Sequence, residues 1–104
     1  MAAFDIGGLD DVIHGRLRLG VMAYLSSAEV ADFNELKALL QATQGNLSVH
    51  LRKLEDAGYV AIEKSFLGRK PLTRIRITPS GRKAFGEYLK AMGRLVDSAS
   101  EEEA

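Results

Sequence analysis

The 104-residue sequence contains no cysteine. This absence excludes disulfide bonds and thiolate metal sites, and it is typical of an intracellular protein. No run of about 18 or more apolar residues is present, which argues against a membrane-spanning helix. The segment Met1–Asp10 has no Lys or Arg and does not resemble a signal peptide. We therefore expect a cytoplasmic protein with a single small domain.

The chain has no net charge, but its charges are unevenly distributed. Residues 1–43 hold three basic and six acidic side chains, and residues 84–104 hold two basic and five acidic. Residues 44–83 hold nine basic and three acidic, which gives this central segment a balance of +6. A local positive field attracts phosphate groups, although a solvated charged surface has the same signature in sequence.

Apolar residues at helical spacing predict three helices in the first half of the chain. The first spans about residues 14–25 and ends at Ser26 and Ser27. The second begins after Asp32, which forms a capping box with Glu35, and the third spans about residues 44–57 and ends at Gly58. The residues expected to face the core are Ile13, Leu17, Val21, Leu25, Phe33, Leu36, Leu39, Leu40, Leu47, Leu51 and Leu54.

After the third helix the hydrophobic period changes to two, which predicts a β-hairpin. Its strands cover about residues 60–66 and 73–77, and the connection over 67–72 is longer than a minimal turn. Thr78 then caps a last helix that has Pro79 at its first position. Residues 98–104 are expected to be a disordered acidic tail, which leaves residues 1–97 as the domain. The predicted fold class is mainly α with a small β-hairpin (α+β), in the order helix-helix-helix-hairpin-helix, which is the plan of a winged helix-turn-helix.

Three segments carry a resemblance to a known family. They are Phe33-Asn-Glu-Leu-Lys-Ala-Leu-Leu40, Gly45-Asn-Leu-Ser-Val-His-Leu-Arg-Lys-Leu-Glu-Asp-Ala-Gly-Tyr-Val60 and Thr78-Pro-Ser-Gly-Arg-Lys-Ala-Phe85. The chain resembles MarR/ArsR-type winged-helix regulators from about Leu9 to Met92. The resemblance implies a dimeric repressor or activator with a recognition helix at 44–57 and a wing at 60–78. The chain departs from metal-sensing ArsR members because it has no Cys and only His14 and His50.

The outer face of the third helix is expected to contact DNA. Ser48 can form hydrogen bonds in the major groove, Val49 can meet a thymine methyl group, and Arg52 can bind guanine or phosphate. Gly45 leaves room for a close approach of the backbone. The expected DNA-binding residues are Gln44, Gly45, Asn46, Ser48, Val49, His50, Arg52, Lys53, Arg69, Lys70 and Arg74.

Structural roles that do not involve DNA are the alternatives for several of these residues. Thr43 or Asn46 can serve as the helix cap, and His50 can be a half-buried residue hydrogen-bonded to the backbone. The basic wing can be an ordinary solubilising hairpin.

The last helix and the N-terminal segment carry more apolar surface than a small domain needs. The heptad-like spacing in the last helix predicts a homodimer interface, and the alternative is that both segments pack on the core of their own chain. The expected interface residues are Phe4, Ile6, Leu9, Phe85, Tyr88, Leu89, Met92, Leu95 and Val96.

These patterns together predict a sequence-specific DNA-binding transcriptional regulator. It would bind a palindromic operator in double-stranded DNA as a homodimer, with the recognition helix in the major groove and the wing on the backbone or minor groove. The alternative is a winged-helix module for protein interaction within a larger assembly. No catalytic constellation, metal triad or phosphate-binding glycine loop is present, so we expect no enzyme, no metal and no cofactor. No feature of the sequence identifies a small-molecule effector.

Overall fold

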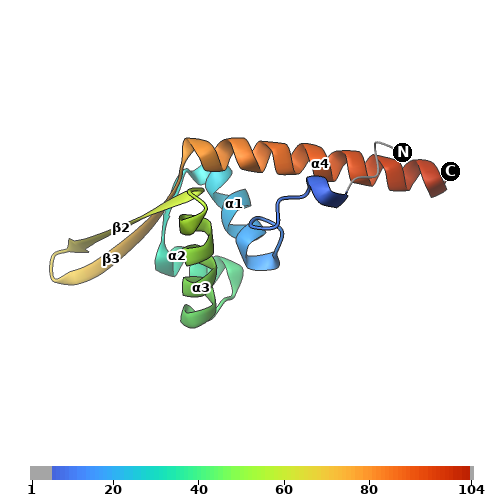
Figure 1. Cartoon of the computed structure of the whole chain (residues 1–104). Coiled ribbons are helices and arrows are strands. Elements are labelled where there is room, and N and C mark those ends of the chain that lie inside the picture. The colour runs from blue at the N-terminus through green and yellow to red at the C-terminus, as the bar shows by residue number, and fades with distance from the viewer. Residues whose placement is uncertain (1–5, 104) are drawn as a thin grey trace.

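The chain forms four α-helices around a small antiparallel sheet. The computed structural model describes residues 6–103, and its long axis measures 59 Å against 26 and 21 Å for the other two. The elements are η1 (Ile6–Gly8), α1 (Arg16–Ala28), β1 (Val30–Asp32), α2 (Phe33–Leu40), α3 (Gln44–Asp56), β2 (Val60–Leu67), β3 (Lys70–Ile77) and α4 (Pro79–Glu103). The predicted winged helix-turn-helix order is therefore confirmed, with the β2–β3 hairpin as a wing that projects from the body (Figure 1).

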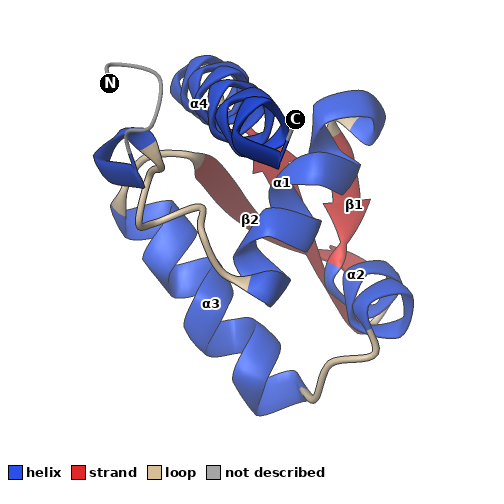
Figure 2. Cartoon of the chain, turned by 90° about the vertical axis from the view of Figure 1, so that its right-hand side faces the viewer, coloured by secondary structure: helices blue, strands red, loops and turns tan. Residues whose placement is uncertain are grey.

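Helices α1 to α3 cover one face of the sheet, and α4 crosses the body beside α1 (Figure 2). The core cluster contains most of the predicted helix residues, among them Ile13, Val21 and Leu36, which are fully buried. Phe33 and Leu40 are partly buried and pack against this cluster. Leu39 was predicted to face the core, but it is 53% exposed because it lies on the outer side of the short helix α2. No described helix combines the length and apolar character needed to span a bilayer.

Hydrogen bonds at the helix starts follow the predicted caps. The Asp32 carboxylate accepts a hydrogen bond from the Glu35 N–H at 2.7 Å, and the Glu35 carboxylate accepts one from the Asp32 N–H at 3.4 Å. This reciprocal pair is the predicted capping box of α2. At α3 the hydroxyl of Thr43 accepts from the backbone N–H of Asn46 at 3.1 Å. Thr43 is thus the cap, and the Asn46 amide is not used for it.

Helix α1 differs from its prediction at both ends. It begins at Arg16 and continues through Ser26 and Ser27 to Ala28, whereas the sequence predicted that the two serines would end it. Their hydroxyls donate to carbonyl oxygens three residues earlier, at 2.7 and 3.4 Å. A serine that bonds back to the preceding turn can remain inside a helix, so this pair does not end α1.

The sheet has three strands in the order β1-β3-β2, one more than the predicted hairpin. Strand β1 pairs with β3 over three residues, from Val30 opposite Arg76 to Asp32 opposite Arg74. Three residues are too few to show a period of two in sequence. The extra strand makes β3 the central strand of the sheet and ties the start of α2 to the wing.

The wing turn is shorter than predicted. Only Gly68 and Arg69 connect β2 to β3, and Gly68 has a φ of 66°, as the first residue of a type II′ hairpin turn requires. Pro71 suggested a longer connection, yet it pairs with Phe66 inside the ladder. The pair that closes a two-residue turn exchanges hydrogen bonds and the next pair does not. The missing N–H of Pro71 therefore costs no bond to β2.

The end of α3 and the start of α4 meet at one backbone junction. Gly58, with a φ of 81°, ends α3 as predicted, and Thr78 caps α4 by accepting a hydrogen bond from the Gly81 N–H at 2.9 Å. The Thr78 hydroxyl also donates to the Gly58 carbonyl at 2.6 Å, and the Thr78 N–H donates to the Tyr59 carbonyl at 3.1 Å. The residues that follow α3 are therefore joined to the start of α4 by direct hydrogen bonds.

Helix α4 extends further than the sequence predicted. Residues 98–103, expected to belong to a disordered tail, continue the helix to Glu103. Glu and Ala are favourable helix residues, and no Gly or Pro interrupts this stretch. Ala104 lies outside the described residues.

Candidate nucleic-acid interface

Helix α3 presents a polar outer face along its whole length. Its inner residues Leu47, Leu51 and Leu54 are buried, as the helical spacing predicted. Of the DNA-binding residues predicted on this helix, His50 is half-buried and the others are exposed, namely Gln44, Gly45, Asn46, Ser48, Val49, Arg52 and Lys53. The structure therefore gathers these predicted residues on one accessible surface.

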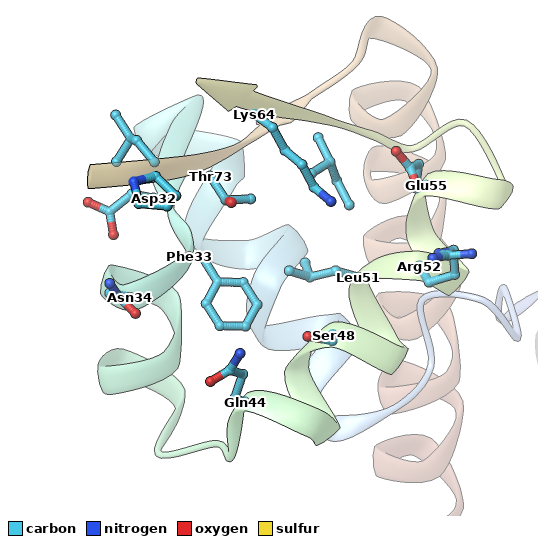
Figure 3. A pocket seen from close by; sticks show the side chains of 13 residues that line it. Asp32, Phe33, Asn34, Gln44, Ser48, Leu51, Arg52, Glu55, Lys64 and Thr73 are labelled. Carbon is cyan, nitrogen blue, oxygen red and sulfur yellow. The ribbon is translucent and has the colours of Figure 1, made fainter. Parts of the chain in front are cut away.

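A polar hollow of about 670 Å³ lies between α3 and the wing (Figure 3). Lys64 from β2 and Ser48 from α3 enter it from opposite walls (Figure 3). Its lining residues are Asp32, Phe33, Asn34, Gln44, Ser48, Leu51, Arg52, Glu55, Ile62, Lys64, Pro71, Leu72 and Thr73. Three predicted DNA-binding residues, Gln44, Ser48 and Arg52, form the α3 side of this hollow.

The pairing register divides the basic residues of the wing between two faces. Lys64 pairs with Thr73 and shares its face with Ile62, which lies against the helices. Arg74 is displaced by one residue from Thr73 and therefore points to the opposite, outer face. Lys64 was missed by the sequence analysis, and the predicted Arg74 is not brought together with the α3 residues. The spacing of two residues from the apolar Ile62 is the sequence signal that could have placed Lys64 on the inner face of β2.

The two basic side chains of the hollow, Arg52 and Lys64, form no ion pair with the described residues. Among residues 6–103 the ion pairs join Arg76 to Glu63 at 3.6 Å and Arg82 to Glu29 at 3.3 Å, and both are solvent-exposed. The hollow also contains Asp32, whose carboxylate is occupied by the capping box, and Glu55. Arg52 and Lys64 therefore remain available for an external anion.

His50 connects α3 to the beginning of α1. The Arg18 guanidinium donates to His50 Nδ1 at 2.7 Å, which places the proton of a neutral ring on Nε2. Burial lowers the pKa of His50, and the nearby charges of Arg18 and Lys53 lower this pKa further. His50 is half-buried, as the alternative to a DNA contact expected, but its hydrogen-bond partner is a side chain rather than the backbone.

Two further side-chain hydrogen bonds tie the N-terminal segment to the body. The Tyr59 hydroxyl donates to Asp10 at 2.5 Å, and this bond, with burial, raises the pKa of Tyr59 to about 12. The ring of His14 bonds to the Tyr88 hydroxyl of α4 at 2.8 Å. No group of three metal-ligating side chains occurs among the described residues. The two histidines of the chain therefore have structural partners.

The tip of the wing carries the remaining predicted contacts. Arg69 lies in the turn, Lys70 begins β3, and both are exposed. Phe66 and Leu67, which immediately precede the turn, are also exposed. The wing therefore ends in a combination of cationic and apolar side chains.

The predicted dimer residues separate into two groups. Leu9, Phe85 and Tyr88 are buried in the core of their own chain, so the prediction that they lie at an interface is corrected in favour of its alternative. The others remain accessible: Ile6, Leu89 and Val96 are exposed, and Met92 and Leu95 are half-buried. Phe4 lies outside the described residues.

Comparison with known proteins identifies the family. A family described as winged helix DNA-binding domain has a sequence model that matches residues 17–96. An uncharacterized protein of Methanocaldococcus jannaschii is 40% identical over 78 residues, which cover 75% of this chain and 85% of that protein. The solved structure of a transcriptional regulator homologue from Pyrococcus horikoshii OT3 matches with a TM-score of 0.86 at 28% identity, covering 95% of this chain and 98% of that one.

A more distant structure shares the fold. NadR, solved in complex with 4-hydroxyphenylacetate, matches with a TM-score of 0.69 at 19% identity, over 94% of this chain and 69% of NadR. The winged-helix resemblance inferred from the sequence is thus confirmed by both sequence and structure. The chain belongs to the winged helix DNA-binding domain family.

Proposed function

We propose that this protein is a transcriptional regulator that binds a palindromic operator as a homodimer. The observation that carries the proposal is the continuous surface formed by the outer face of α3, the hollow beside it and the basic wing. Helix α3 enters the major groove, where its first turns face the base edges. The wing lies against the adjoining backbone and minor groove.

In the proposed complex the side chains of α3 contact base edges, and a side chain of the wing contacts the phosphate backbone. Gln44 and Ser48 occupy the first half of α3, with hydrogen-bonding groups suited to base edges. Arg52 lies one turn beyond Ser48 and contacts guanine or the edge of the backbone. Lys64, on the facing wall, neutralises a phosphate. Base contacts set the sequence preference, and the phosphate contact fixes the position of the domain.

The part of α4 from Leu89 onward supports the dimer. The first half of α4 packs on α1 through buried residues, whereas the second half extends away from the helices and contacts η1 (Figure 1). Leu89 and Val96 are 51% and 53% exposed, and Met92 and Leu95 are half-buried between them. A projecting helix with an apolar stripe is marginal in water and is stabilised by a second helix. A second copy of the chain provides this partner and matches the twofold symmetry of a palindrome.

Selection from a random duplex library tests DNA binding. We expect a palindromic consensus, bound more tightly than scrambled duplex in fluorescence anisotropy. Arg52→Ala should weaken binding to the selected site about 10-fold to 100-fold, and binding to scrambled DNA much less. Lys64→Ala should weaken both, and should lower the slope of log affinity against log salt by about one per protomer. Failure to enrich any sequence would favour the protein-interaction alternative.

Sedimentation tests the homodimer. The double variant Leu89→Asp, Val96→Asp should be monomeric at concentrations where the wild type is dimeric. Both side chains are about half exposed, so the monomer fold should survive. Leu39→Asp on α2 is the matched control, because Leu39 is 53% exposed on a different element. A monomeric wild type, or equal dissociation by the control, contradicts the assignment of the interface to α4.

A further inference from the structure

The wing tip presents two large apolar side chains to solvent. Phe66 and Leu67 are each 72% exposed, more than any other large apolar residue among those described. Neither belongs to the core cluster or to the half-buried shell around it. Their apolar surface therefore contributes little to folding, and its position requires another explanation.

Phe66 and Leu67 point to opposite faces of the hairpin. Phe66 pairs with Pro71 and lies on the face of Lys64, which lines the hollow beside α3. Leu67 pairs with Lys70 on the outer face. Phe66 is thus continuous with the surface that faces the DNA in the proposed function, and Leu67 is not.

The charge around Phe66 indicates the class of partner. From Lys64 to Arg74 the wing carries four basic residues and no acidic one. Of these, Lys64 shares the face of Phe66 and Arg69 lies in the turn beyond it. An aromatic ring among cations fits the minor groove, where phosphates line the rims and the sugars and base edges form an apolar floor. The exposed patch of one Phe and one Leu is small compared with the roughly 800 Å² per partner of a stable protein interface.

The reach of the wing fits the same partner. Ile62 lines the hollow beside α3, and Phe66 lies four residues further along β2, or about 13 Å at ~3.3 Å per residue. The minor groove next to a major-groove site lies about half a helical turn away, roughly 17 Å. The tip of the wing, from Phe66 to the turn beyond it, therefore extends about as far from the hollow as the flanking minor groove lies from a major-groove site.

We propose that Phe66 acts as an apolar wedge that enters the minor groove, partly unstacks one base step and kinks the operator. Lys64, on the same face as Phe66, and Arg69, in the turn, hold the phosphates on either side of the insertion. Pyrimidine–purine steps are the easiest to unstack, so Phe66 contributes a preference for such a step at each flank of the operator. This inference rests on the proposed function and assigns one specificity-determining residue to it.

The bend is measured by fluorescence resonance energy transfer between the ends of a duplex that carries the selected operator. The wild type should bend the duplex by about 20–90°. Phe66→Ala should straighten it, lose the preference for a flanking pyrimidine–purine step and bind about tenfold more weakly. Leu67→Ala is the matched control, equally exposed on the opposite face, and should keep the bend and the preference.

Each other outcome rejects the wedge. An unchanged bend and preference in Phe66→Ala shows that the ring does not enter the duplex, while the proposed function still stands. Equal losses in Phe66→Ala and Leu67→Ala overturn the assignment to one face. Binding to anionic vesicles that depends on Phe66, with unaltered DNA binding, assigns the tip to a membrane surface. A wild type that binds no duplex overturns both the wedge and the proposed function.

Discussion

Replacing Gly81 by Ala should disrupt the junction between the end of α3 and the start of α4. Gly81 lies in the first turn of α4, against the backbone of Tyr59. A Cβ atom added to Gly81 would lie 2.1 Å from the carbonyl oxygen of Tyr59, 2.9 Å from its carbonyl carbon and 3.1 Å from its Cα. All three are backbone atoms, so no change of side-chain rotamer relieves the overlap.

The size of the effect follows from the movement that the overlap requires. Cβ atoms do not approach other heavy atoms more closely than 3.0 Å, so the first turn of α4 must move by about 1 Å. Overpacking of this kind costs about 1–3 kcal/mol. The movement also stretches the Thr78 N–H bond to Tyr59, now 3.1 Å, which contributes about 1 kcal/mol. We expect a loss of about 2–4 kcal/mol in the free energy of unfolding and a Tm lower by at least about 10 °C.

Gly45→Ala is the matched control for this substitution. Gly45 is also a helical glycine, but a Cβ atom there would meet nothing within 4 Å. Its Tm should be unchanged or a few degrees higher, since Ala favours the helix by up to about 1 kcal/mol. Thermal unfolding is followed by far-UV circular dichroism at one protein concentration, because association shifts Tm. A Gly81→Ala protein as stable as the Gly45→Ala protein would refute the tight junction.

Three further results are expected. Gly45→Ala, although stable, should bind the operator about tenfold more weakly because its methyl group separates the α3 backbone from DNA. An unchanged affinity would show that the DNA does not contact this turn of α3. Because the pKa of His50 is lowered in the folded chain, the unfolded chain binds a proton at this residue first as the pH falls. The free energy of unfolding should therefore be at its full value above about pH 6.5 and decrease below it. In urea unfolding, His50→Gln should not show this decrease. The raised pKa of Tyr59 means that its protonated hydroxyl, bonded to Asp10, stabilises the folded chain below about pH 10. This contribution to the free energy of unfolding disappears as the pH rises toward about 12. Tyr59→Phe should cost about 1 kcal/mol at neutral pH and remove this alkaline loss, and identical alkaline unfolding of both proteins would contradict the role of its bond to Asp10.

Local chemistry made most of the fold predictable. The leucines of α3, the capping box of Asp32 and the glycine that ends α3 each depend on residues within one or two turns, and all three predictions are confirmed. Strand β1 depends instead on its register against β3, which is distant in sequence. The short wing turn depends on whether Pro71 falls on a non-bonded pair, and this too is decided by register. The missed features are therefore those set by long-range pairing.

The candidate site divides in the same way. The exposed residues of α3 follow from its helical period, because their orientation is fixed by the inward leucines. The contribution of Lys64, and the separation of Arg74 from α3, require the face of each strand to be known. The apolar stripe of α4 could be recognised in the sequence. Apolar character alone could not show that Tyr88 is buried in the core whereas Leu89 is exposed.

The contacts around α3 suggest how dimerisation and DNA recognition are linked. A palindromic site requires two recognition helices to reach major grooves one turn of DNA apart, about 34 Å. In this chain α3 is fixed to α4 by the backbone junction at Thr78, and to the N-terminal segment through the bond between Tyr59 and Asp10. The bond between His14 and Tyr88 fixes that segment in turn to α4. In the proposed dimer, a partner held by α4 would set the distance between the two α3 helices through these short, hydrogen-bonded links, and a change at the α4 surface would alter the spacing of the half-sites.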